Sequence, residues 1–173
     1  MRRSIHSFLT KKTILIAGSI ILIGIGLIVT LAVINTAKSP QENQTATKES
    51  PNFQTVLPNG TSIDTLGGWT RISPPENDPV FAYTDTINNV SITVSQQPAP
   101  ISFKNNLDTE VAEVAKKFNA TSQLVAGSVK AYIGTSAKGP QSVIFVKNNL
   151  LILMKSVQKI DDSKWIAYIK SLS

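Results

Sequence analysis

A candidate catalytic pair in the sequence is Ser156 and Lys159, which lie three positions apart. A Ser-x-x-Lys pair is typical of serine acyl enzymes, in which the lysine activates the hydroxyl from one helical turn away. Here the serine falls at the end of an apolar run typical of a strand. The sequence also contains neither Ser-Asp-Asn nor Lys-Thr-Gly, the motifs that accompany such a dyad. The pattern therefore disfavours this chemistry.

A second pair, Asp161 and Asp162, offers two carboxylates for metal binding or acid–base catalysis. Neighbouring side chains point in different directions, so adjacent aspartates rarely share one ligand. The pair also comes directly before an amphipathic segment, where Asp and Ser are preferred as helix N-caps. We therefore expect Asp161, Asp162 or Ser163 to cap a helix.

Asp85 is the residue that fits a purely structural role least well. If Asn88-Asn89 forms a two-residue hairpin turn, Asp85 faces Ile92 and lies on the apolar face of its strand. A buried carboxylate is costly without a partner. One interpretation is a longer or bulged loop, or an inward-pointing charge that protects an edge strand. The other is that Asp85 contacts a ligand, together with Arg71.

Composition excludes several kinds of site. The chain has no Cys, so disulfides, thiolate catalysis and cysteine zinc sites are impossible. Its only histidine, His6, belongs to the N-terminal tail, which removes imidazole chemistry from the rest of the chain. We predict no catalytic residue, no metal site and no cofactor.

The net charge of +6 is concentrated at the N-terminus. Lys and Arg number 17 against 11 Asp and Glu, and Arg2, Arg3, Lys11 and Lys12 supply four of them. Residues 53–173 carry 11 basic and 9 acidic residues, a balance of +2. This nearly neutral remainder argues against nucleic acid as a partner.

The basic tail precedes 22 uncharged residues, 13–34, of which 16 are Ile, Leu, Val or Ala. A helix of this length rises roughly 33 Å, enough to cross a hydrocarbon core about 30 Å thick. A cleaved signal peptide has a shorter apolar region, and Asn35-Thr36-Ala37 is no small-x-small cleavage site. The positive-inside rule then predicts a single-pass signal-anchor in the cell membrane, with the N-terminus cytoplasmic and the C-terminal part outside.

Within this span, Gly26-x-x-x-Thr30 has the small-xxx-small spacing that lets two membrane helices approach closely. Residues 35–52 are polar and rich in Pro, Ser, Thr and Asn, which is typical of a disordered tether. The predicted organisation is a cytoplasmic tail (1–12), a transmembrane helix (13–34), the tether (35–52) and an extracytoplasmic domain (53–173).

The extracytoplasmic part has strand-like and helical periodicity. Runs of residues 70–72, 80–87, 90–97, 141–147 and 150–157 predict strands, with another strand around Tyr132 and Ile133. Asn-Asn turns at 88–89 and 148–149 predict two hairpins. The unbroken apolar flanks of the second place it at the centre of the sheet.

Leu107, Val111, Val114, Ala115 and Phe118 share one helical face, with Asn105, Asn106 or Asp108 as N-cap and Asn119 as terminator. Trp165, Ile166, Ile169 and Leu172 share another. The order βββ, α, ββββ, α predicts an α+β domain with a mostly antiparallel sheet of six to seven strands and two packed helices.

The last part of the chain has a recognisable pattern: a strand (129–135), a hydrophobic strand pair (143–146 and 150–154) and a final helix with a polar start (161–172). In this pattern the chain resembles uncharacterised bacterial membrane-anchored extracytoplasmic domains, of the PsbP-like or related α/β sandwich type. The resemblance implies a bacterial origin and an outside location, and it carries no catalytic residue over.

Two functions follow as hypotheses. The first is a non-enzymatic binding, sensing or envelope-interaction module, whose partners are the lipid bilayer through residues 13–34 and an envelope protein or ligand. The alternative is an extracytoplasmic hydrolase with carboxylate or Ser/Lys chemistry. A binding module should have an exposed apolar patch or an open sheet edge, whereas an enzyme should have a concave pocket with convergent polar groups.

The topology can be tested with reporter fusions placed after residue 60. Because the basic residues precede the apolar run, we expect a reporter that works only outside the cytoplasm to be active, and a cytoplasmic reporter to be silent. A fusion active in the cytoplasm, or a product released by cleavage near residue 37, would contradict the signal-anchor.

Overall fold

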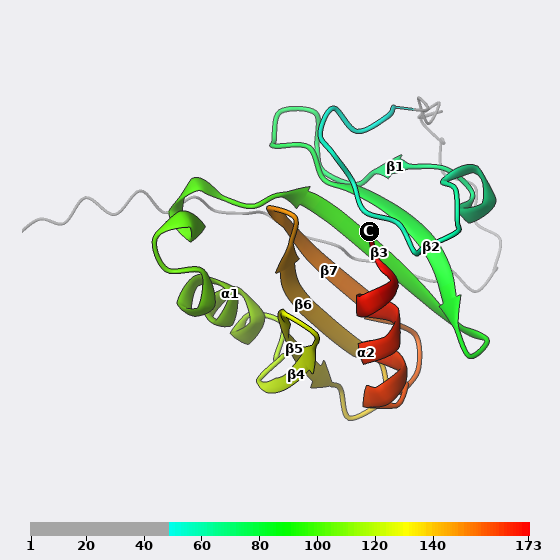
Figure 1. Ribbon diagram of the computed structural model, residues 1–173, viewed down its shortest axis with the longest axis vertical. Coiled ribbons are helices and arrows are strands. Elements are labelled where there is room, and N and C mark those ends of the chain that lie inside the picture. Colours follow the sequence, from blue (N-terminus) through cyan, green and yellow to red (C-terminus); the bar gives the residue numbers. More distant parts are fainter. Residues whose placement is uncertain (1–48) are drawn as a thin grey trace, which may run out of the picture. The chain divides into compact units, whose positions relative to one another are not determined.

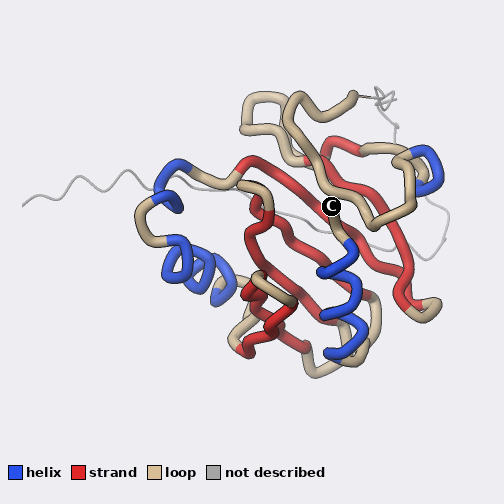
Figure 2. Tube along the Cα trace, in the orientation of Figure 1, coloured by secondary structure: helices blue, strands red, loops and turns tan. Residues whose placement is uncertain are grey.

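Seven antiparallel strands and two α-helices make up residues 49–173, the part of the chain that the computed structural model describes. Figure 1 labels these elements and Figure 2 colours them by type. In chain order they are η1 (Asp64–Leu66), β1 (Thr70–Arg71), β2 (Phe81–Ile87), β3 (Val90–Pro98), η2 (Ile101–Lys104), α1 (Leu107–Lys116), β4 (Ser122–Ala126), β5 (Val129–Thr135), β6 (Gln141–Lys147), β7 (Leu150–Ser156) and α2 (Asp162–Ser171).

The strands form one sheet in the order β1-β2-β3-β7-β6-β5-β4. Every neighbouring pair is antiparallel, which confirms the α+β class and the strand number. No helix among the described residues is long and apolar enough to cross a membrane. The predicted transmembrane helix, residues 13–34, lies outside the described residues.

Both Asn-Asn turns are two-residue hairpins, as predicted. All four asparagines have positive φ angles, from 48° at Asn88 to 64° at Asn89. These values are in the left-handed region that a type I′ turn requires and that asparagine tolerates. The turns set the register on either side, so that Ile87 pairs with Val90 and Lys147 pairs with Leu150.

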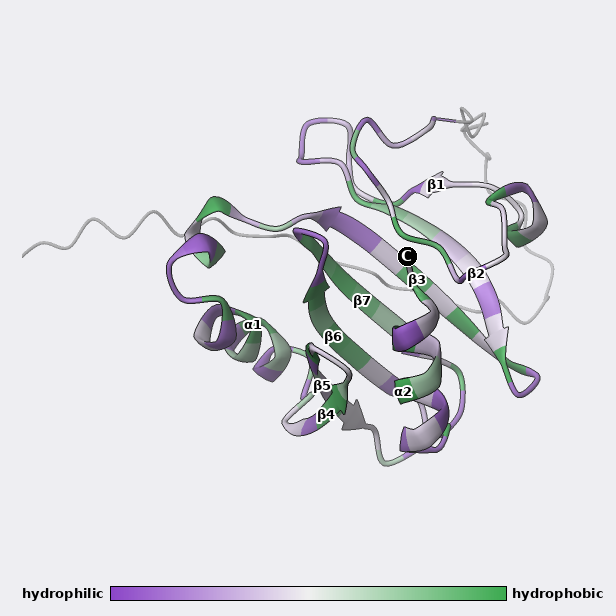
Figure 3. Cartoon of the chain, in the orientation of Figure 1, coloured by the Kyte–Doolittle hydropathy of each residue, from purple (hydrophilic) through white to green (hydrophobic). Residues whose placement is uncertain are grey.

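The second hairpin, β6 and β7, occupies the centre of the sheet, also as predicted. Both of its faces are buried: Phe145 and Ile152 face α2, whereas Ile144 and Leu151 face α1. Figure 3 shows the resulting hydrophobic strands, in contrast to the more polar β2 and β3. Burial on both sides explains why neither strand alternates in sequence.

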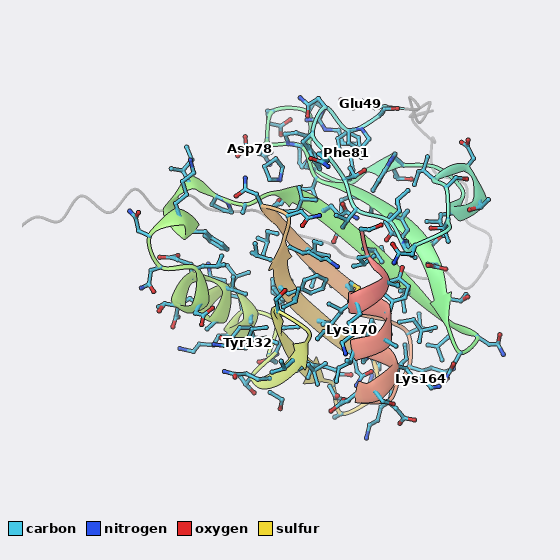
Figure 4. All side chains as sticks on the ribbon, viewed as in Figure 1. Glu49, Asp78, Phe81, Tyr132, Lys164 and Lys170 are labelled. Atoms are coloured by element: carbon cyan, nitrogen blue, oxygen red, sulfur yellow. The ribbon has the colours of Figure 1, made fainter. Side chains whose placement is uncertain are left out.

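Helix α1 covers one face of the sheet over β5 and β6. Val111 and Ala115 on its inner side are buried with Tyr132 of β5 and Ile144 of β6. Tyr132 lies between α1 and the sheet (Figure 4). Helix α1 ends at Lys116, and the turn that follows it closes at the predicted terminator Asn119, whose φ is 55°. There the Ala120 N–H donates to the Ala115 carbonyl, the bond of a Schellman cap.

Helix α2 covers the other face, where the sheet curls around it. Trp165 and Ile169 are completely buried there in one cluster with Phe145 of β6 and Ile152 of β7, whereas the helix backbone lies nearest to β4 and β2. Lys147 donates hydrogen bonds to the carbonyls of Ile169 and Leu172, where the C-terminus of α2 carries partial negative charge. Partial burial lowers the pKa of this lysine.

The predicted side-chain caps of both helices are wrong in one respect. Asn106 and Asp161 do occupy the N-cap positions, but neither side chain makes a capping hydrogen bond. Their backbone carbonyls accept the first hydrogen bonds of each helix, from the N–H of Glu110 in α1 and from the N–H groups of Lys164 and Trp165 in α2. Acidic residues in the first turn, such as Asp108 and Asp162, still favour the positive end of each helix.

The segment before β1 is attached to the sheet through a buried glutamine. Gln96 of β3 accepts a hydrogen bond from the Val56 N–H (3.0 Å) and donates one to the Val56 carbonyl (2.6 Å). Beside it, Leu57 and Ser173 exchange two backbone hydrogen bonds. The carboxamide thus pairs with Val56 as a neighbouring strand would.

The burial of Trp165 generates a stability prediction. Truncation of a buried Trp typically costs about 3 to 5 kcal/mol, and a small domain has only about 5 to 15 kcal/mol in total. We expect Trp165→Ala to unfold much of the fragment 53–173, which should otherwise fold alone. Denaturant titration measures the change.

Lys164→Ala is the matched control, because Lys164 is one residue away and exposed (Figure 4). It should change the free energy of unfolding by less than about 0.5 kcal/mol. A Trp165→Ala variant as stable as this control would mean that α2 does not hold the sheet together.

Candidate functional site

Asp85 lies where the sequence predicts, on the α2 face of β2 and opposite Ile92. The longer or bulged loop is therefore wrong. The carboxylate is partnered: the Tyr168 hydroxyl of α2 donates to Oδ2 at 2.8 Å, and the Thr86 N–H donates to Oδ1 at 2.7 Å. The residue is half-buried. Because both oxygens accept a hydrogen bond, the apolar face can hold the charge.

Tyr83 extends this polar cluster along β2. The Tyr83 hydroxyl lies 3.5 Å from the Tyr168 hydroxyl. The ring of Trp69 packs edge-on against the ring of Tyr83, with 5.3 Å between the ring centroids. Burial raises the pKa of Tyr83 to about 12, although the hydrogen bond to Tyr168 opposes the shift. Burial also raises the pKa of Tyr168. Both phenols are therefore neutral at physiological pH, and Tyr168 stays a donor to Asp85.

Arg71 does not join Asp85. Its guanidinium forms an ion pair with Glu49 at 3.0 Å and donates to the carbonyls of Pro75 and Asn77. In the β1–β2 register Arg71 stands opposite Phe81, four residues before Asp85. Arg71 thus holds the loop between β1 and β2, and the two candidate ligand-contact residues have separate partners.

A polar cleft lies at the far end of β5, where the chain leaving α1 crosses the strand. Gly134 makes this crossing possible, because a Cβ at that position would lie 2.2 Å from the Asn119 carbonyl oxygen. The cleft on one side of the crossing has a volume of about 420 Å³ and is lined by hydroxyls, the Gln141 amide, Lys159 and Asp162. The cleft on the other side has about 270 Å³.

Ser156 and Lys159 line different clefts, Lys159 the larger and Ser156 the smaller. The Ser156 hydroxyl donates to the Gln158 carbonyl and accepts from the Gln141 N–H. It therefore holds the end of β7 in place. Among residues 49–173, no group of three His, Cys, Asp or Glu side chains could hold a metal ion.

One edge of the sheet is β4, a strand that the predicted order of seven strands includes but whose bounds the sequence patterns do not fix. It pairs with β5 on one side only, with an unbroken register of five residues and a turn at Gly127. Leu124 and Ala126 point into the core, whereas Val125 is 65% exposed. The alternation of Leu124 and Ala126 with Gln123 and Val125 was the available signal.

The hydrogen-bond pattern shows which groups of β4 face outward. In a two-residue hairpin the residues that flank the turn, Ala126 and Val129, form a hydrogen-bonded pair, and such pairs then alternate. Gln123 and Val125 are the non-hydrogen-bonded positions. Their N–H and C=O groups therefore point away from β5, and no other described backbone group bonds them.

The contact between Asp85 and Tyr168 can be tested with a double-mutant cycle. We expect Asp85→Ala and Tyr168→Phe each to lower the free energy of unfolding, with a coupling of about 1 kcal/mol, since each removes the other's partner. Thr84→Ala, at an exposed position of the same strand, is the control. Zero coupling with unchanged stability would mean that Asp85 has no structural role and is available to a ligand.

Residues 49–173 thus offer three features that another molecule could contact: the cluster around Asp85, the paired clefts at Gly134 and the edge of β4. The first is already satisfied by partners from within the domain. The clefts have the polar linings that the hydrolase alternative would require, but Ser156 and Lys159 line different ones. The edge leaves strong hydrogen-bonding groups of the backbone unused. No family model, curated protein or solved structure matches this chain.

Proposed function

We propose that this protein is a membrane-anchored binding module that holds its α+β domain outside the cytoplasm and engages an envelope partner by strand addition. The observation that carries the proposal is the open edge of β4, where Gln123 and Val125 present unused backbone groups. Strand addition takes its affinity from such main-chain hydrogen bonds and its specificity from neighbouring side chains.

The two ends of the sheet differ in a way that supports this assignment. β1 has only two residues and leads into a loop with two prolines, Pro74 and Pro75, which are typical protections of an edge. β4 has five residues with no proline, charge or bulge. An unprotected edge can pair with another strand. The lack of such protection at β4 therefore favours a binding role for this edge.

The anchor rests on the sequence. The basic tail and the 22 uncharged residues favour a signal-anchor, and residues 35–52 would place the domain on the order of 20 to 25 Å from the bilayer if they form a flexible coil. A tether of this kind leaves the sheet edge free to meet other envelope components. The partner is therefore expected in or near the membrane.

Photo-cross-linking in intact membranes tests this function. A photoreactive residue would replace Val125 in the full-length chain, and Thr84, exposed on the face of β2 and away from the edge, would carry it in the control. We expect adducts from position 125 and few from position 84. Absence of adducts at position 125, or equal yields at both positions, would contradict the proposed edge.

A further inference from the structure

The free groups of β4 are complementary to themselves. An antiparallel neighbour must offer pairs of N–H and C=O groups in the same alternation as the strand it joins. A second β4, related to the first by a two-fold axis beside Leu124, offers the same alternation. Gln123 of the first copy then lies opposite Val125 of the second, and Val125 of the first lies opposite Gln123 of the second. Each of these two pairs exchanges two hydrogen bonds, so every free group of Gln123 and Val125 finds a partner.

Charge does not oppose such a pairing. β4 itself has no charged residue, and Lys130, which lies opposite Val125 in the β4–β5 pair, forms an ion pair with Asp108 at 2.6 Å. The side chain of Val125 would lie beside Gln123 of the other copy, on the face away from α2. Both Leu124 side chains would remain in their own cores, since each is buried.

The size of the contact favours a partner that is already nearby. Five residues of edge bury far less than the roughly 1,200 Å² of a specific, stable interface. A freely diffusing partner would therefore bind weakly through β4 alone. Copies anchored in one membrane meet at a high effective concentration, which converts a weak contact into a populated one. In addition, Gly26-x-x-x-Thr30 gives the predicted spans a second surface for the same association.

We propose that β4 pairs antiparallel with β4 of a second copy of this chain, with Gln123 opposite Val125, and joins the two sheets edge to edge. This inference rests on the proposed function, because it names the partner that the β4 edge takes. It predicts an isologous homodimer at the membrane surface, with α2 of both copies on the same side of the joined sheet.

The absence of cysteine from the chain permits a clean cross-linking test. Two differently tagged full-length chains, Gln123→Cys and Val125→Cys, are co-expressed and oxidised in their own membranes. Opposite residues of a strand pair lie about 5.5 Å apart at Cα, within reach of a disulfide. The same residue in the two copies, such as Val125 and Val125, is offset along the strands. The two Cα atoms are then more than about 7 Å apart, beyond the reach of a disulfide. We expect disulfide-linked dimers that carry both tags when the two variants are co-expressed. We expect no cross-linked dimer when either variant is expressed alone.

Thr70→Cys, exposed at the opposite edge of the sheet, is paired with Val125→Cys as the control for random collision. Cross-linking in this control as efficient as in the 123–125 pair, or no cross-linking in the 123–125 pair, would overturn the second copy as the partner. The photo-cross-linking experiment separates the two failures. Adducts at position 125 with a different protein leave the binding function in place and remove only the homodimer.

Discussion

The architecture depends on one buried carboxamide, that of Gln141 at the start of β6. Its oxygen accepts hydrogen bonds from the Trp165 indole (2.9 Å) and from the Ile160 N–H (2.7 Å), and its nitrogen donates to Thr135 (3.1 Å). The side chain is 3% exposed, so these three bonds replace water. Through them the central hairpin, the neighbouring strand and the start of α2 are fixed relative to one another. The loss of this amide would leave an indole N–H and a backbone N–H without partners inside the core, a costly state.

The same face of the sheet carries further polar groups, and each binds a different segment. Gln96 holds Val56, Lys147 holds the end of α2, and Asp85 holds Tyr168. No buried side-chain polar atom among the described residues lacks a hydrogen-bond partner. An apolar face would let α2 and the segment around Val56 slide, whereas each of these bonds forms in one arrangement only. We therefore attribute the unique packing of this face to its few polar residues, and its burial energy to the apolar ones.

Much of this fold is predictable from the sequence because it depends on local rules. Two asparagines in succession tolerate positive φ, and the two-residue turns then fix the partner of every residue in β2 and β3, including Asp85. The roles of Gln96 and Gln141 could not be predicted. Their partners lie 40 and 24 residues away, and periodicity does not indicate contacts between distant segments. The bounds of β4 could not be predicted for a different reason: its inward residues, Leu124 and Ala126, form too short an alternation to delimit a strand.

The attachment of the N-terminal segment also has a mechanical consequence. Leu57 and Ser173 exchange backbone hydrogen bonds, and Asn59 bonds to Ser171, so the chain enters the domain beside the end of α2. If residues 35–52 are a tether under tension, the pull first meets the ion pair of Glu49 with Arg71, which is exposed and therefore weak, and then the hydrogen bonds of Val56 and Leu57. The hydrogen bonds of this segment with Gln96 and Ser173 would be loaded in shear, so that they bear the force together. Under such a load this segment would yield first, and the sheet edge at β4 would keep its geometry.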